Sequence, residues 1–568
     1  MNDIRRTILW VIFGFSMVLL WDQWQVHNGN KATFFPTPSQ QAKVAADAAS
    51  VASQVAGVPA PVLAPGAASV PVVESRAASK ELVQVETDVA KLTFDTEGGS
   101  LVRVELLKHE DEQKPGNKIV LLDDSKDRIY NAQTGLISGV PGVTLPTHKT
   151  LMTVRPGPRQ LKEGTNELVI TFESPTQSGI KLVKSYTIKR GAYDMVVKHD
   201  IVNSGTQEVT PQLYFQLVRD GNKLAGESSF YSTFTGPAVY TEAKKYQKVE
   251  FADIKKKKVE VETQSNTGYV AMVQHYFASA WILPDGLSRN ISMDAVDIGS
   301  TMPDCCYRAT LIAPLEAIKP GQTKTVAATF FAGPQEENKL EALYPGLELV
   351  KDYGWLTILA KPLFWLLDQL NSILKNWGWS IVALVVLLKA GFYWLNAHAY
   401  QSMAKMKAIN PKIMEMRERL KDNPQQMQME MMKIYREEKV NPMGGCLPIA
   451  IQIPVFIALY WVLLSTVEIR NAPWVGWIHD LSAPDPYFIL PLVMTLTTLL
   501  QTALNPAPPD PMQAKMMWIM PLAFSVMFFF FPAGLVLYWI TNNVLSIAQQ
   551  WLINVRMGVP PQFNLPKF

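Results

Sequence analysis

The sequence predicts a multidomain membrane protein in which an all-β domain is followed by an α-helical membrane core. Residues 81–345 consist of short segments rich in Val, Ile, Thr, Tyr and Phe, separated by turn signals such as Glu97-Gly-Gly99. Long apolar stretches begin only after residue 353. A further apolar run, 7–21, precedes the β-rich region. A chain of 568 residues with this distribution must serve at least two physical environments.

The run 7–21 follows Arg5 and Arg6 and could be a signal-peptide core or a short membrane anchor. The residues after it lack a small-x-small cleavage site, and Trp21 and Trp24 suit a membrane interface. We therefore predict an uncleaved transmembrane anchor at 1–26. Residues 27–80 are rich in Ala and Pro and sustain no helical or strand period, which predicts a linker.

The β-rich region 81–345 contains many strand-like runs, such as 168–172 and 184–188, and few helical patterns. We expect an antiparallel sandwich. Within 346–377, Leu359, Leu363, Leu366, Leu370 and Ile373 follow helical spacing with charges on the other side, so we expect an amphipathic helix lying on the membrane.

Five spans are predicted in the membrane core, residues 378–556, before a short tail, 557–568. The spans are expected at 381–395, 447–467, 487–504, 516–531 and 533–552.

The basic residues of the short loops set the orientation. Residues 400–441 carry nine Lys and Arg, whereas 468–486 carry only Arg470. Because basic loops stay in the cytoplasm, we expect both termini to be cytoplasmic and the β domain to lie in the periplasm of a multi-pass inner-membrane protein. The segment 400–441 should form a cytoplasmic helical hairpin whose second helix opens at Pro424.

Composition argues against several function classes. A net charge of +3 gives no general attraction to nucleic acid. The seven His are scattered, and no metal-ligand spacing or Gly-rich phosphate loop is present in the sequence. We predict no enzyme activity, no catalytic residue, no metal and no cofactor.

Polar residues inside the predicted spans are the strongest functional signal. Lys389 lies in the predicted span 381–395, where a charge costs roughly 2.5 to 3.5 kcal/mol on insertion scales. Lys389 could extend to the headgroups, but its combination with Gln452, between Pro448 and Pro454, favours a hydrated cavity.

Two further polar patterns occur in the spans. In the last span, Tyr538, Asn542, Ser546 and Gln549 form one polar stripe that supports the cavity. The predicted span 487–504 contains threonines at positions 495, 498 and 502. We expect these threonines to form hydrogen bonds between helices.

The hairpin region is rich in Met. Met403, Met427 and Met431, with Lys405 and Lys407, could form a surface that recruits partners of varied shape. A Met-lined seam between the two helices explains the same residues.

Three segments carry a family resemblance. Residues 441–460 read NPMGGCLPIAIQIPVFIALY, residues 531–539 read FPAGLVLYW, and the hairpin contains MAKMK and MRERL. Together they resemble the membrane core and hairpin of the YidC/Oxa/Alb3 family of membrane-protein insertases. The anchor and the β-rich domain resemble the Gram-negative branch of this family, whose periplasmic domain is a β-supersandwich.

The resemblance implies an insertase and chaperone for inner-membrane proteins that acts alone or with the Sec translocon and needs no nucleotide hydrolysis. Its groove, open to cytoplasm and lipid, would use Lys389, Gln452, Tyr538, Trp539 and Asn542. The family usually places Arg where this chain has Lys389, so the charge is kept but the planar guanidinium that contacts a carboxylate bidentately is not.

Nascent membrane proteins, the Sec translocon, lipids, the ribosome and the signal-recognition machinery are the implied partners. After residue 553 the only basic residues are Arg556 and Lys567, which does not support ribosome binding through the tail.

Two other classes of protein predict different features. A small-solute transporter predicts inverted repeats, but Pro448 and Pro454 have no counterpart in a second half. A carbohydrate-binding or sugar-modifying β domain predicts dispensable C-terminal spans.

Overall fold

The computed structural model describes residues 80–111, 114, 116–222, 233–297, 305–420, 423–438, 447–505, 511–558 and 563. The predicted anchor 1–26 and linker residues 27–79 lie outside this part. The chain divides into a β unit that ends at Lys351 and a helical unit that begins at Asp352. Each unit is described by itself.

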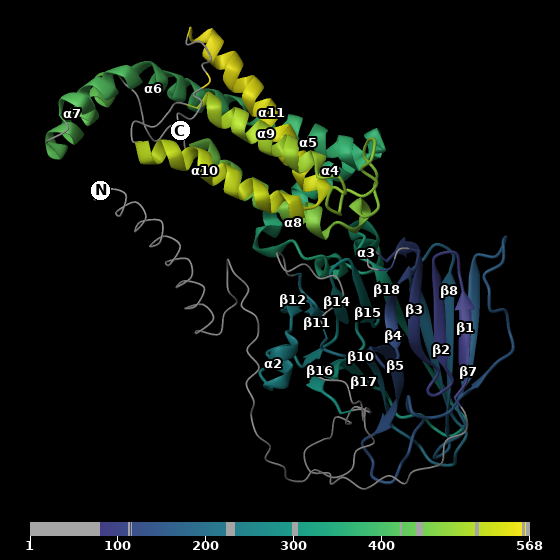
Figure 1. Cartoon of the computed structure of the whole chain (residues 1–568). Helices are drawn as coiled ribbons and strands as arrows, with labels where there is room; N and C mark the ends of the chain where they lie inside the picture. Colours follow the sequence, from purple (N-terminus) through teal and green to yellow (C-terminus); the bar gives the residue numbers. More distant parts are fainter. Residues whose placement is uncertain are drawn as a thin grey trace. The chain divides into compact units, whose positions relative to one another are not determined.

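The β unit contains two sheets, each of nine strands, which form two layers (Figure 1). The first sheet runs, in spatial order, β1(Leu82–Glu86), β2(Ala90–Asp95), β3(Ser100–Glu110), β4(Lys118–Asp124), β5(Ile129–Ser138), β10(Pro211–Arg219), β17(Tyr307–Pro314), β16(Arg289–Ala295) and β13(Gln264–Ser265). The second runs β12(Lys245–Lys248), β11(Gly236–Thr241), β14(Tyr269–Gln274), β15(Phe277–Ile282), β18(Thr323–Pro334), β9(Asp194–Asn203), β8(Ile180–Lys189), β7(Glu167–Glu173) and β6(Thr153–Val154). The strand pairs within each sheet are antiparallel.

The alternation of side chains explains how the sheets pack. Along β8, every second residue from Ile180 to Ile188 is buried while its neighbours are partly exposed. The turn before β3 needs glycine, because Gly98 and Gly99 have positive φ and a Cβ on Gly98 would lie 2.4 Å from the carbonyl oxygen of His148. The inward residues of both sheets form one apolar core, which confirms the predicted all-β sandwich.

The β unit also contains short helical elements. These are the helices α2(Phe251–Lys255) and α3(Glu337–Leu343) and the 3-10 turn η1(Leu347–Val350).

The second unit is helical, as predicted, with an apolar core of its own. Its elements are η2(Gly354–Leu356), α4(Thr357–Leu374), α5(Trp377–Gly391), α6(Tyr393–Arg419), α7(Pro424–Glu437), α8(Leu447–Ser465), η4(Val467–Ile469), α9(Ile489–Leu504), α10(Pro511–Met527), η5(Phe528–Phe530) and α11(Ala533–Arg556).

Helix α4 forms within the predicted range 346–377. Of its predicted apolar stripe, Leu363, Leu366 and Leu370 are partly buried and pack against the core, whereas Leu359 and Ile373 are exposed. The fully buried residues of the helix lie beside this stripe: Ala360, Phe364 and Leu367.

The apolar run 381–395 is not one straight helix. Helix α5 ends at Gly391, α6 begins at Tyr393, and their axes differ by 69°. Figure 1 shows α6 leading away from α5 toward α7. Within the described residues, this bent pair has the length and apolar composition of a membrane span, and no single straight helix does.

Candidate functional site: a polar hollow between α5, α6, α8 and α11

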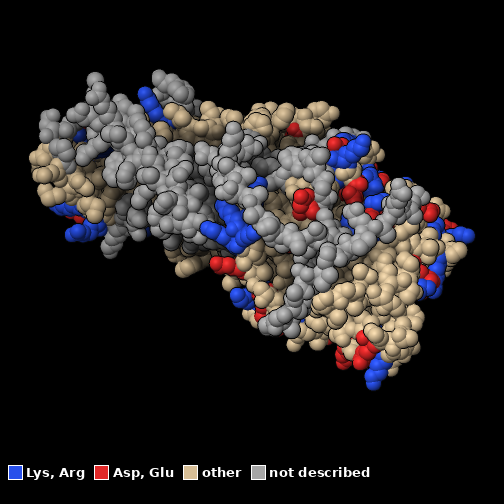
Figure 2. All heavy atoms as spheres, turned by 90° about the horizontal axis from the view of Figure 1, so that it is seen from below, with Lys and Arg blue, Asp and Glu red and all other residues tan. Residues whose placement is uncertain are grey.

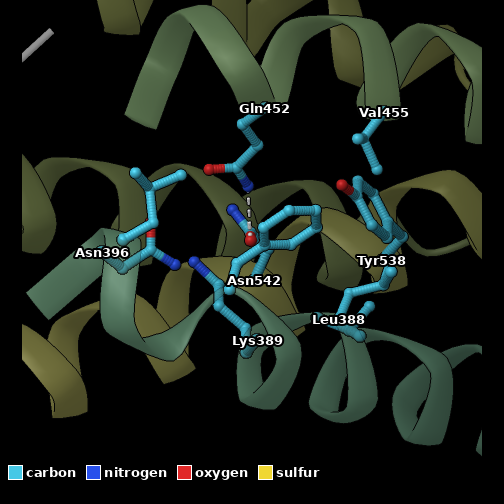
Figure 3. A pocket seen from close by; sticks show the side chains of 10 residues that line it. Leu388, Lys389, Asn396, Gln452, Val455, Tyr538 and Asn542 are labelled. Atoms are coloured by element: carbon cyan, nitrogen blue, oxygen red, sulfur yellow. Dashed lines mark hydrogen bonds between the residues drawn. The ribbon is translucent and has the colours of Figure 1, made fainter. Parts of the chain in front are cut away.

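A hollow lies between α5, α6, α8 and α11. Four residues singled out from the sequence line it: Lys389, Gln452, Tyr538 and Asn542. The other lining residues are Val385, Leu388, Phe392, Leu395, Asn396 and Val455. Half of the ten lining residues are apolar, and the other half carry polar groups that converge from separate helices (Figure 3).

Lys389 provides the charge of this hollow. Its side chain is partly exposed, and its ammonium nitrogen lies 2.7 Å from the Ser546 hydroxyl oxygen. None of the ten described residues that line the hollow is acidic. The cation is thus held by a neutral acceptor, and its charge is not neutralised by a carboxylate in the lining.

A second hydrogen bond joins α8 to α11. The Gln452 amide nitrogen donates to the Asn542 side-chain oxygen at 2.7 Å, and Figure 3 shows the two amides pointing toward one another. Pro454, two residues beyond Gln452, lies inside α8. This bond fixes the polar ends of two lining side chains across the hollow.

Trp539 lies elsewhere. Its ring packs edge-to-face on Phe456, with centroids 4.7 Å apart, and on Phe528 at 5.1 Å. It is absent from the described lining of the hollow, so it contributes to an aromatic cluster of the core.

Helix α11 also has a second polar side. The Asn543 amide donates to the hydroxyls of Thr497 and Thr498 at 3.2 and 2.9 Å, which is the hydrogen bonding between helices expected for Thr498. Thr495 and Thr502 instead donate to carbonyls of their own helix, Pro491 and Thr498.

The comparisons with known proteins agree over nearly the whole chain. The family model for the YidC periplasmic domain matches residues 82–366, and the model for the 60Kd inner membrane protein matches 369–559. A membrane protein insertase YidC of Cupriavidus necator is 54% identical over 560 residues, 98% of each chain.

The chain belongs to the YidC family of membrane protein insertases.

Other relatives with the same name extend this finding. The protein of Ralstonia nicotianae is 52% identical over 98% of each chain, and that of Burkholderia multivorans is 51% identical over 98% of this chain and 99% of its own. A solved structure of an active YidC insertase, with its first transmembrane domain resolved, is 20% identical and covers 83% of this chain and 92% of that one, with a TM-score of 0.38. The relatives are named insertases rather than enzymes, and the family is that of an inner-membrane protein with a periplasmic domain.

The hairpin of this family member has a partly apolar seam. Met427 and Met431 of α7 pack against the buried Ile409, Ile413 and Met416 of α6. The pairs Lys412–Glu438 and Arg419–Glu430, at 2.6 and 2.7 Å, join the helices at the surface. The Asn423 side chain caps α7 by accepting from the Gln426 amide, and Pro424 opens the helix as predicted.

The remaining hairpin candidates are placed differently. Met403 is partly exposed and Lys405 exposed, while the side chain of Lys407 lies outside the described part. Where Figure 2 shows described residues, basic and acidic side chains are interspersed.

Among the polar lining residues, sequence reasoning missed Asn396, and it did not recognise Ser546 as the partner of Lys389. Asn396 is 8% exposed and follows the bend between α5 and α6. It lies seven residues after Lys389, a spacing that places two residues on the same face of a straight helix, two turns apart. This spacing was therefore a signal that could have identified Asn396, although the chain bends between the two residues.

Proposed function

We propose that the hollow is the substrate-contacting groove of this insertase. Lys389, Gln452, Tyr538 and Asn542 would receive the polar segment of a client, while Trp539 would support the wall from the core. The observation that carries the proposal is the Lys389 cation, which is held by the neutral Ser546 hydroxyl in a lining without a carboxylate.

The physical task is to move polar groups of a client past an apolar layer, where each unpaired group costs several kcal/mol. A hydrated hollow shortens that layer. The Lys389 charge attracts acidic residues of the entering segment, and the apolar client helix then partitions into lipid, which releases the polar part across the membrane. Burial of the client helix provides the free energy, so no nucleotide hydrolysis is required.

The proposed organisation assigns residues 1–26 to an anchor, 27–80 to a linker, 81–345 to the periplasmic domain and 346–377 to an interfacial helix. The core would be 378–556, with its hairpin at 400–441, and the tail 557–568. Both termini would be cytoplasmic. The single basic residue of 468–486 and the nine of 400–441 support this orientation.

The hairpin would recruit partners on the cytoplasmic side. Lys405, Lys407 and Met403 would contribute directly, and Met427 and Met431 would maintain the seam that presents them. Nascent inner-membrane proteins are the clients, and the Sec translocon, the ribosome, the signal-recognition machinery and membrane lipids are the proposed partners.

Site-specific photo-crosslinking tests the groove. A photoreactive residue at Asn542 should crosslink to a nascent membrane protein with a short polar segment. The matched control is Val544, which is exposed and lies about 200° around α11 from Asn542. Equal crosslinking from the two positions would refute the proposal that the client occupies the hollow.

A further inference from the structure

The Ser546 hydroxyl is the hydrogen-bond acceptor of the Lys389 ammonium, at 2.7 Å. Ser546 itself is 2% exposed, so it belongs to the buried wall of α11, whereas the lysine side chain is partly exposed. The contact joins α5 to α11 between residues 157 positions apart in the chain.

The serine is oriented for this contact. Its hydroxyl donates to the Asn542 carbonyl oxygen, one turn earlier in α11, at 2.7 Å. With its proton committed to that carbonyl, the oxygen presents its lone pairs to the ammonium, which can only donate. Asn542 also accepts from Gln452, so the chain of bonds continues from α5 through α11 to α8.

From this arrangement we infer that Ser546 is a positioning residue for the substrate-receiving charge. It keeps the Lys389 ammonium inside the hollow, at the wall of α11, until the carboxylate of a client accepts hydrogen bonds from it. This inference rests on the proposed function of the hollow.

The physical reason is the length of the lysine side chain. A flexible four-carbon stem lets an ammonium move toward water or headgroups when no acceptor holds it near an apolar wall. A hydroxyl acceptor takes a hydrogen bond from one N–H of the ammonium without neutralising the charge of the lysine. A carboxylate in the same place would neutralise it and compete with the client, so serine suits a charge that must be held and remain available.

The test uses two matched clients whose translocated segments are acidic or neutral, and protease protection in vesicles reconstituted with the full chain. Ser546→Ala should lower insertion of the acidic client relative to the neutral one by roughly tenfold, the factor expected from the lower end of the range for a hydrogen bond to a charged group. Ser546→Thr keeps a hydroxyl and should retain most of the ratio. Ser546→Val, which has the shape of Thr, should lose it.

Ser525→Ala is the matched control. Ser525 is 3% exposed in α10 and donates to the carbonyl four residues earlier, at 2.8 Å, as Ser546 does. Its loss should leave the acidic-to-neutral ratio unchanged, because no lysine is recorded at its hydroxyl among the described contacts.

The outcomes separate the two ideas. If Lys389→Ala reduces the ratio while Ser546→Ala and Ser546→Val match the parent, the positioning role is refuted and the groove charge stands. If Lys389→Ala leaves the ratio unchanged, the proposed function of Lys389 fails, and the inference fails with it.

Discussion

Lys184 and His199 lie directly opposite each other on β8 and β9, and both bond to Thr134 of the facing sheet. The Lys184 nitrogen donates to the carbonyl oxygens of Thr134 and Gly98 at 2.7 and 2.6 Å. The His199 Nε2 lies 2.9 Å from the Thr134 hydroxyl. Both side chains are fully buried, so two basic groups bridge the layers of the sandwich.

The stability of the β unit should depend on Lys184 above neutral pH. Burial lowers the pKa of Lys184 from 10.5 to about 7. Between pH 7 and 10.5 the unfolded chain binds the proton and the native state does not, so the free energy of unfolding rises with pH over this range. This pH-dependent contribution to stability is fully present above pH 10.5 and is lost as pH falls through 7. Lys184→Met should remove this slope in urea unfolding followed by far-UV circular dichroism.

The control for that experiment is Lys181→Met, on the same strand but partly exposed and paired with Glu173 at 2.5 Å. Its pH profile should follow that of the parent. Parallel profiles of the parent and Lys184→Met between pH 7 and 10 would contradict the prediction.

A separate acid sensitivity should come from His199. Burial and, to a lesser extent, the charge of Lys184 lower the pKa of His199 from 6.5 to about 3. The unfolded chain therefore gains a proton first as pH falls, and stability is lost between pH 6.5 and 3. His199→Gln, which can still bond to Thr134, should flatten this part of the same unfolding profile. An unchanged loss of stability in acid would assign it to other groups.

Lys389 should act through its charge. Lys389→Arg should retain insertion of all clients, whereas Lys389→Ala should impair acidic clients and spare neutral ones, because the attraction acts on client carboxylates. The Ala variant should remain folded, since removing a partly buried cation relieves a desolvation cost. Protease protection of matched clients in reconstituted vesicles measures both. Equal insertion of every client by Lys389→Ala and the parent would exclude this role.

Asp485 should be critical for the connection before α9. Its carboxylate is 1% exposed and accepts from the Trp477 indole and the backbone amides of Tyr487 and Leu490, at 3.0, 3.0 and 2.7 Å. Asp485→Ala leaves three donors unpaired and should destabilise the helical unit by about 2 to 5 kcal/mol. Thermal unfolding in detergent would measure this loss. Asp480→Ala, which removes bonds to Ser482 alone among the described contacts, should cost clearly less.

The proposed orientation can be checked by cysteine labelling at exposed positions. Glu110 and Asn471 should react from the periplasmic side, and Asn423 and Gly558 from the cytoplasmic side. The reason is the retention of basic loops in the cytoplasm. Labelling of Asn423 from the periplasm would invert the scheme.

Local sequence patterns predicted which regions form strands and helices, but the orientation of side chains often depended on distant partners. The alternation along β8 places Lys184 on the inward side, yet its acceptors Gly98 and Thr134 come from the other sheet. Likewise, hydropathy could not reveal the 69° bend after Gly391, because an apolar run reads the same whether the helix is straight or bent.

The site shows the same division. The polar stripe of the last span correctly grouped Tyr538 and Asn542, since helical spacing is a local property. The bond between Lys389 and Ser546 joins two helices far apart in sequence, and helical spacing along one segment does not determine which residues meet across a cavity.

Helix α11 carries Asn542 on the side of the hollow and the adjacent Asn543 on the side of α9. One inserted or deleted residue turns everything beyond it by about 100°, which would separate Ser546 from Lys389 and carry Gln550 away from Asn505 in a single step. The number of residues in this helix is therefore as constrained as their identity. Side chains here can be exchanged one at a time, whereas a residue added or removed within the helix before Ser546 would break both sets of contacts together.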